Sequence, residues 1–115
     1  MLGFGRGKQS EERYFVDLDN GSSGAFDYDV KITAVEMRGY GDVVAVSDMV
    51  RRGEMLVVDL SNFADVESKR RDAIKELRDL SAETGGSFSE MSGRTVIIVP
   101  PGVGLEKVRI TRRNR

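Results

Sequence analysis

Four aspartates in two short alternating segments are the side chains of this sequence best placed to do chemistry. Asp17 and Asp19 lie in VDLDN, and Asp27 and Asp29 lie in FDYDV. Carboxylates at such a spacing can exchange protons or bind Mg²⁺. The same alternation is typical of the solvent-facing side of an edge strand. We therefore interpret these aspartates as surface residues and do not expect an enzyme.

The residue types that the chain lacks narrow its chemistry further. Its 115 residues include no cysteine and no histidine. Disulfides, thiolate metal sites and a cysteine nucleophile are thereby excluded, and the usual general base near neutral pH is missing. We expect no catalytic residue, no cofactor and no metal site.

Composition and charge indicate one globular domain of ordinary size. Hydrophobic residues make up 39% of the chain and charged residues 32%. The 18 basic and 19 acidic residues give a net charge of −1, which argues against a dedicated nucleic-acid binder. No run approaches the length of a membrane span, and the N-terminus lacks the apolar core of a signal peptide. We expect a cytoplasmic protein.

The chain divides into three segments by composition. Residues 1–27 are rich in glycine, serine and charge, and we expect a flexible N-terminal segment and linker. Residues 28–110 have the periodic patterns of an α/β domain. Residues 111–115 form a basic tail, which we interpret as solubilising, although it could also touch anionic lipid, an acidic partner or nucleic acid.

Hydrophobic spacing predicts two helices. The first follows Asp42, which we expect to cap it, and ends at Gly53. The second is expected to be capped by Asp65 or Ser61 and to end at Gly85 or Gly86. The apolar stripe of the first contains Val43, Val46, Met49 and Val50, and that of the second contains Val66, Ala73, Ile74, Leu77 and Leu80.

Five strands complete the predicted domain, in the order β-α-β-α-β-β-β. They are expected within residues 29–37, 54–62, 87–91, 94–100 and 106–112. The third and fourth should form a hairpin through Ser92 and Gly93. The fold class is therefore an α/β sandwich, with two helices packed on one face of a mixed sheet of about five strands.

Two of the predicted strands are apolar on both sides. In TVIIVP, Ile97 and Val99 point one way while Val96 and Ile98 point the other, and MLVVDL behaves alike. Two helices can cover only one face of the sheet. We therefore expect the other face to meet a second copy of the protein, making a homodimer. The alternative is that the N-terminal segment folds back over it.

Residues 41–103 resemble the globular domain of SepF, a cell-division protein family of bacteria and archaea. The matching features are the strand VVDLS, the helix ending in Gly85 and Gly86, and the strand running into PPGV. The resemblance covers roughly residues 30–105 and is closer to archaeal members. It implies a non-catalytic adaptor that dimerises, binds the C-terminal tail of the tubulin-like protein FtsZ, and ties FtsZ filaments to the inner face of the membrane at the division site.

The resemblance also implies a groove for the FtsZ tail, with an oily floor and charged walls. We expect this groove on the hairpin and the adjoining helix. Phe88, Met91 and Val96 would supply its floor, together with Ile98, which lies on the same predicted strand as Val96. Arg78 and Arg94 would bind carboxylates at its edge. The alternative is that Phe88 and Met91 are core residues.

Some positions depart from the family pattern. Val96 stands where bacterial members often have an aromatic residue, Glu90 where they often have a basic one, and Asp79 where they have a glycine at a helix contact. Asp79 disfavours the ring assembly of bacterial members, because it would place like charges at that contact.

The family's N-terminal membrane helix has only a weak counterpart here. Leu2 and Phe4 are apolar and Arg6 and Lys8 are basic, but the glycines between them disfavour a helix. We expect at most a weak membrane anchor, strengthened by dimerisation.

Two other classes of function remain open. A small dimeric nucleic-acid-binding protein of the archaeal chromatin type would show steep salt dependence in DNA binding, and we expect no nucleic acid. A small-molecule sensor domain would gain thermal stability from its ligand.

Overall fold

The structure is a computed structural model that describes residues 13 and 29–112. Its elements belong to one compact unit, residues 31–115. In chain order they are β1 (Ile32–Glu36), the short 3₁₀ helix η1 (Tyr40–Asp42), α1 (Val43–Arg51), β2 (Met55–Asp59), α2 (Glu67–Glu83), β3 (Ser87–Met91) and β4 (Thr95–Val99). Apart from Arg13, the N-terminal segment predicted as a linker and weak membrane anchor lies outside the described residues, and so do Leu2, Phe4, Arg6 and Lys8.

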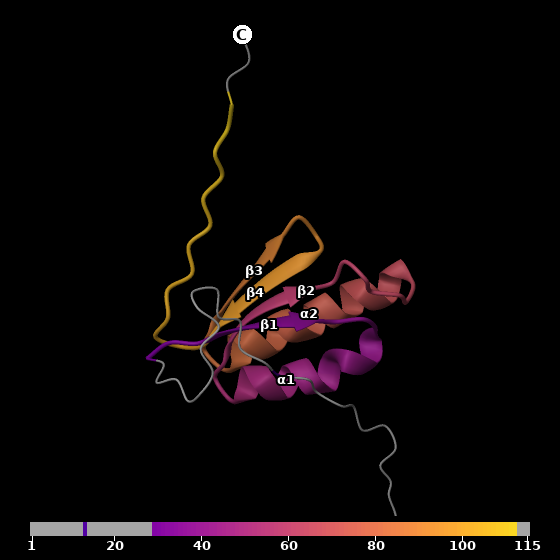
Figure 1. Cartoon of the computed structure of the whole chain (residues 1–115), viewed down its shortest axis with the longest axis horizontal. Coiled ribbons are helices and arrows are strands. Elements are labelled where there is room, and N and C mark those ends of the chain that lie inside the picture. Colours follow the sequence, from indigo (N-terminus) through magenta and orange to yellow (C-terminus); the bar gives the residue numbers. More distant parts are fainter. Residues whose placement is uncertain (1–12, 14–28, 113–115) are drawn as a thin grey trace, which may run out of the picture. The chain divides into compact units, whose positions relative to one another are not determined.

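The four strands form one mixed sheet in the order β1-β2-β4-β3. β1 and β2 are parallel, whereas β4 is antiparallel to both of its neighbours. α1 supplies the crossover that a parallel pair requires, and α2 leads from β2 to the edge strand β3. Both helices lie on the same face of the sheet (Figure 1). The predicted α/β class and the single helical layer are confirmed.

The core lies between that face and the helices. Leu56 and Val58 of β2 are buried, and so are Val96 and Ile98 of β4, each with at most 1% of its surface exposed. The helices contribute Val46, Met49, Val50, Ala73, Ile74 and Leu77. Full burial of a side chain of this size contributes about 1.5–3 kcal/mol, so these residues dominate the stability of the domain.

The two sides of β1 differ in how far they are covered. Ile32 and Ala34 lie on one side and are exposed, with 62% of Ile32 accessible. Val35 instead packs against the core, because it pairs in register with the buried Val58. The register with β2 therefore decides which side of β1 is covered.

The predicted N-terminal capping hydrogen bonds are not made. Asp42 stands at the N-cap position of α1 and Val66 at that of α2, and neither helix has a side-chain hydrogen bond at its cap. The Asp42 carboxylate accepts the backbone N–H of Arg38 at 2.7 Å, and the Asp65 carboxylate accepts that of Tyr40 at 2.7 Å. Both aspartates thus fix the loop between β1 and α1. Val66 precedes α2 and is 66% exposed, so it does not belong to the buried stripe.

The paired glycines after α2 have two separate tasks. Gly85 has a φ of +84°, the left-handed conformation that ends a helix. The N–H of Gly86 donates to the Ser81 carbonyl at 2.9 Å and that of Gly85 to the Ala82 carbonyl at 3.1 Å, which completes a Schellman motif. A Cβ on Gly86 would overlap the carbonyl oxygen of Val99. Gly86 thus permits the close approach of α2's end to β4.

The predicted hairpin is confirmed in detail. Ser92 and Gly93 have φ values of 53° and 74°, so both central residues are left-handed. The pairing of Met91 with Thr95 leaves a three-residue loop, in which the Arg94 N–H donates to the Met91 carbonyl at 3.4 Å. β3 and β4 then pair from Ser87↔Val99 to Met91↔Thr95.

The fifth predicted strand, over residues 106–112, is wrong. The described sheet has four strands, and residues 103–112 form no helix or strand. A turn at Pro100–Val103 comes first, with Gly102 at a φ of +89° and the Val103 N–H bonded to the Pro100 carbonyl. The chain then leaves the sheet as an extended segment (Figure 1). Its alternation of residue types reflects exposed side chains on both sides and not a covered face.

Gly86→Ala tests the glycine junction. The substitution should lower the free energy of unfolding by about 2 kcal/mol, because the new Cβ overlaps the Val99 carbonyl and the helix end must shift. Urea denaturation measures the change. Gly41→Ala is the matched control, since no atom lies within 4 Å of its Cβ position, and it should change stability by less than about 0.5 kcal/mol. Equal effects of the two substitutions would contradict the role given to Gly86.

Candidate functional site at the helix–hairpin edge

The surface between α2 and the hairpin, which we call the helix–hairpin edge, carries an aromatic ring under a cation. Phe88 of β3 is half-buried and packs against the core. The guanidinium carbon of Arg78 lies 5.5 Å from the centroid of its ring. Arg78 is exposed, so this cation–π pair presents both a positive charge and an apolar surface to solvent.

Arg70 connects α2 to the hairpin turn. Its Nη1 donates to the carbonyl oxygen of Gly93, while its Nε and Nη2 donate to the carboxylate of Glu67. The hydrogen bond from Arg70 lowers the pKa of Glu67 below its ordinary value, and that from Glu67 raises the pKa of Arg70. The Arg70 side chain is only 18% exposed, so it acts as a fixed strut. Sequence reasoning missed this contact, although the i,i+3 spacing of Glu67 and Arg70 was a signal for the ion pair.

The predicted floor of the peptide groove does not form one surface. Val96 and Ile98 face the helices, with 0% and 1% exposed, and so lie beneath the surface that a bound peptide would touch. Phe88 pairs with Ile98 and shares its side of the sheet. Met91 is an odd number of residues from Phe88 and lies on the opposite face, since successive strand residues alternate. Of the predicted floor residues, only Phe88 remains at the helix–hairpin edge.

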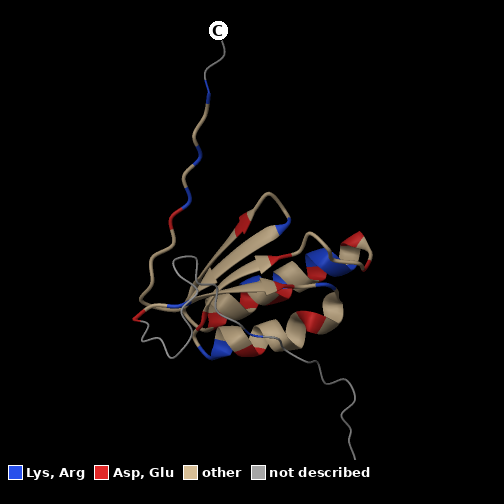
Figure 2. Ribbon diagram, in the orientation of Figure 1, with Lys and Arg blue, Asp and Glu red and all other residues tan. Residues whose placement is uncertain are grey.

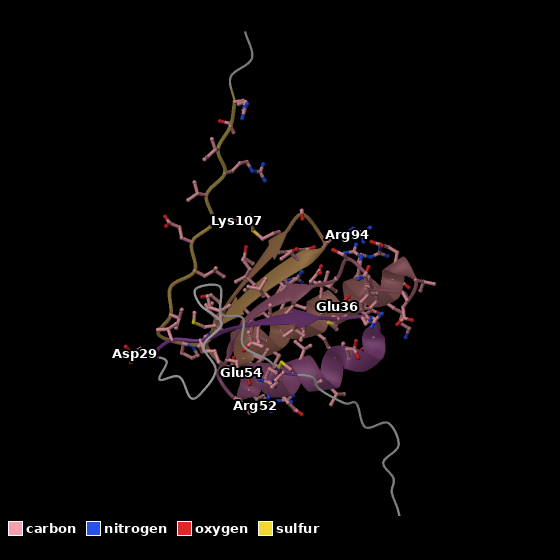
Figure 3. The ribbon with its side chains drawn as sticks, viewed as in Figure 1. Asp29, Glu36, Arg52, Glu54, Arg94 and Lys107 are labelled. Carbon is pink, nitrogen blue, oxygen red and sulfur yellow. The ribbon has the colours of Figure 1, made fainter. Side chains whose placement is uncertain are left out.

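The two predicted arginines are likewise separated. Arg94 is exposed at the end of the hairpin (Figure 3), and its Nη1 donates to the Ser61 carbonyl at 3.3 Å. The Arg94 carbonyl accepts the N–H of Leu60 at 2.7 Å. Because Arg94 precedes β4 and Phe88 pairs with Ile98, about 13 Å of strand lies between Arg94 and the Arg78–Phe88 pair. Arg94 therefore joins the hairpin to the loop after β2 instead of facing Arg78.

The face of the sheet that α1 and α2 leave uncovered, which we call the open face, is apolar along its middle. Ala34, Val57 and Ile97 stand side by side across three strands, and Ser89 completes the row. Ile32 and Met55 pair beside this row. The strands that carry these residues are mostly uncharged in Figure 2, and their charged residues, such as Glu36 and Asp59, lie near strand ends. Such a surface can bury apolar area against another molecule.

One end of the open face is acidic. Glu36 and Asp59 pair there across β1 and β2. The Ser61 hydroxyl and N–H donate to the Asp59 carboxylate at 2.6 and 2.9 Å, which lowers its pKa. The Glu36 carboxylate accepts the Asn62 amide at 2.6 Å. Both carboxylates thus have local partners that hold the loop after β2.

Neither metal binding nor membrane crossing has support in the part of the chain that the structure describes. Its acidic residues form no group of three or more with metal-binding geometry. None of its helices combines the length and apolar character of a membrane span. The described surface carries two features that suit recognition, namely the aromatic–arginine pair at the helix–hairpin edge and the apolar open face.

Comparison with known proteins points to one family. Residues 32–105 match the family model described as "Cell division protein SepF". The chain is also 24% identical over 110 residues to the cell division protein SepF of Haloferax volcanii, an alignment that covers 96% of this chain and 93% of the relative.

Two solved structures have the same fold. The SepF-like protein from Archaeoglobus fulgidus superposes with a TM-score of 0.61 at 21% identity, over 70% of this chain and 98% of that one. The SepF-like protein from Pyrococcus furiosus gives a TM-score of 0.59 at 20% identity, over 71% of this chain and 100% of that one. The helices and mixed sheet described above are therefore the fold of these archaeal proteins.

Arg70→Met tests the strut beneath the helix–hairpin edge. The loss of a charged hydrogen bond to the Gly93 carbonyl should lower the free energy of unfolding by about 1.5 kcal/mol. Faster hydrogen exchange at the hairpin turn should accompany it. Arg71→Met is the matched control, because Arg71 makes only an exposed ion pair with Glu67 at 3.6 Å, and it should cost under about 0.5 kcal/mol. A strut role for Arg70 would be untenable if both variants behaved alike.

Proposed function

This chain belongs to the SepF family of cell-division proteins, and we propose that it is a non-catalytic adaptor that binds the C-terminal tail of FtsZ and links FtsZ filaments to the cytoplasmic membrane. The observation that carries the proposal is the Arg78–Phe88 pair at the helix–hairpin edge. The absence of cysteine and histidine supports an adaptor over a catalyst.

The helix–hairpin edge suits a short peptide that mixes apolar and acidic residues. Phe88 offers an apolar surface held in place by its packing on the core. Arg78 offers a guanidinium that can bind a carboxylate while it remains stacked on the ring. Val96 and Ile98 support the edge from below, because they fix β4 against the helices. We place the FtsZ tail here, with Phe88 and Arg78 as its principal contacts.

A second copy of the chain is our proposed occupant of the open face. The apolar row of Ala34, Val57 and Ile97 would bury its surface against the same row of the partner, as a two-fold interface requires. The acidic end formed by Glu36 and Asp59 would then lie at the rim, where charge can stay solvated. The helix–hairpin edge lies on the side of the sheet that the helices cover. A dimer formed through the open face would leave this edge accessible on both copies and would therefore carry two free peptide sites.

Two sites in one dimer suit an adaptor to filaments. A filament displays many copies of the same tail, so the second binding event becomes intramolecular and overall affinity rises well above that of one site. Two copies of the predicted N-terminal anchor in one dimer would likewise bind the membrane more strongly than one copy. We propose that the protein acts at the inner face of the membrane at the division site.

Arg78→Gln tests the peptide site. The dissociation constant for a synthetic FtsZ tail should rise about tenfold in calorimetry, which corresponds to the loss of one charged contact of about 1.4 kcal/mol. Arg71→Gln removes an equal charge from the same helix away from Phe88 and should bind the tail like the unmodified protein. Equal binding by all three proteins would place the tail elsewhere.

Ile97→Asp tests the dimer. A charge in the middle of the open face should convert a dimer of 12.7 kDa chains into monomers, as measured by light scattering at micromolar concentration. Val44→Asp is the control, since Val44 lies on α1 and is 69% exposed, and it should leave the dimer intact. A monomeric unmodified protein, or a dimeric Ile97→Asp variant, would refute this interface.

A further inference from the structure

The C-terminal segment, residues 105–115, has a net positive charge, unlike the rest of the chain. Residues 105–115 contain five basic residues and one acidic residue, whereas the rest of the chain contains 13 basic and 18 acidic residues. The C-terminal segment is thus strongly positive and the remainder clearly negative, although the sum is −1. A separation of charge of this kind indicates that this segment, and not the rest of the chain, contacts a negatively charged surface or partner.

The segment also exposes apolar side chains between its basic ones. Lys107 and Arg109 alternate with Val108 and Ile110, which are 70% and 87% exposed. Figure 2 shows the basic residues recurring along this extended segment. Isolated exposed aliphatic residues are common, but two alternating with cations on a chain end form a consistent pattern.

The domain itself holds the segment by few contacts. The Lys107 Nζ donates to the Glu90 carbonyl of β3 at 3.1 Å (Figure 3). Beyond it, residues 108–112 are all exposed and form no β-ladder with a described strand. The side chains of Val108, Arg109 and Ile110 are therefore available to an external partner.

We infer that residues 107–112 bind an anionic lipid surface, with Lys107, Arg109 and Arg112 toward the phosphates and Val108 and Ile110 at the boundary with the acyl chains. Lipid is favoured over nucleic acid because both offer phosphates, but only a membrane gives the two aliphatic side chains an apolar environment. The inference rests on the membrane link of the proposed function and adds a contact at the opposite end of the chain from the predicted N-terminal anchor.

Electrostatics alone gives this contact a useful strength. Each basic group close to an anionic membrane strengthens binding about fivefold, so Lys107, Arg109 and Arg112 together supply roughly a hundredfold. Contacts from two copies would multiply in a dimer. The negative charge of the remaining chain would be repelled by the same surface, which leaves the C-terminal segment as the part that approaches it.

The test is co-sedimentation of the full chain with vesicles of equal parts phosphatidylglycerol and phosphatidylcholine. A variant with Lys107→Gln, Arg109→Gln and Arg112→Gln should bind these vesicles roughly a hundredfold more weakly than the unmodified chain. The control carries Arg51→Gln, Arg71→Gln and Lys75→Gln, which removes the same charge from exposed helical ion pairs. It should bind within about twofold of the unmodified chain. A second variant, Val108→Ser with Ile110→Ser, should weaken binding about tenfold without a change in charge.

Several outcomes overturn the inference. The first is an equal loss of vesicle binding in the Lys107→Gln, Arg109→Gln, Arg112→Gln variant and in the control. The second is unchanged vesicle binding in that variant. The third is equal binding of the unmodified chain to vesicles of pure phosphatidylcholine. Tighter binding to a short double-stranded DNA than to the vesicles, lost in the same variant, would assign the segment to nucleic acid instead.

The proposed function is tested separately, by calorimetry with the FtsZ tail. The variant with Lys107→Gln, Arg109→Gln and Arg112→Gln should bind the FtsZ peptide as the unmodified chain does. Failure of the unmodified chain to bind the peptide would count against the adaptor and leave the vesicle result standing. A Leu2→Ser, Phe4→Ser variant reports the N-terminal contribution to vesicle binding independently.

Discussion

Two helices can cover one face of a four-stranded sheet and not both, and the rest of the molecule is arranged around that limit. The central strands carry apolar side chains on each side, so Val58 and Ile98 are buried under the helices while Val57 and Ile97 stand on the open face. A single copy of the described domain therefore leaves a patch that suits another apolar surface. This is why we assign the open face to self-association and the helix–hairpin edge to peptide recognition.

The helix–hairpin edge depends in turn on a tight junction after α2. Gly85 reverses the chain and Gly86 lets the backbone pass beside the Val99 carbonyl, so β3 begins directly against β4. Arg70 then ties the far end of the hairpin to α2 through the Gly93 carbonyl. With both ends of the hairpin fixed, Phe88 is held on the core beneath Arg78. A peptide bound at this edge, as we propose, would contact rigid elements, which would limit the entropy lost on binding.

Local patterns in the sequence were enough to determine most elements of the domain. Helical spacing of apolar residues located α1 and most of α2, and paired glycines located the end of α2. Ser92 and Gly93 located the hairpin turn. The absence of cysteine and histidine limited the chemistry that the chain can perform. These features succeed because each depends on backbone conformation or residue type within a few neighbouring positions.

What only the tertiary structure decided is which side of each strand is covered and which groups meet across the chain. Alternation places Ile32 and Ala34 on one side of β1, and only the pairing with β2 shows that this side is the exposed one. Val96 and Met91, expected in one groove, were separated by the register of β3 and β4. Asp42 and Asp65, expected as caps, bind the loop between β1 and α1 instead. A sequence pattern gives the period of an element, whereas its orientation and partners depend on contacts between residues far apart in the chain.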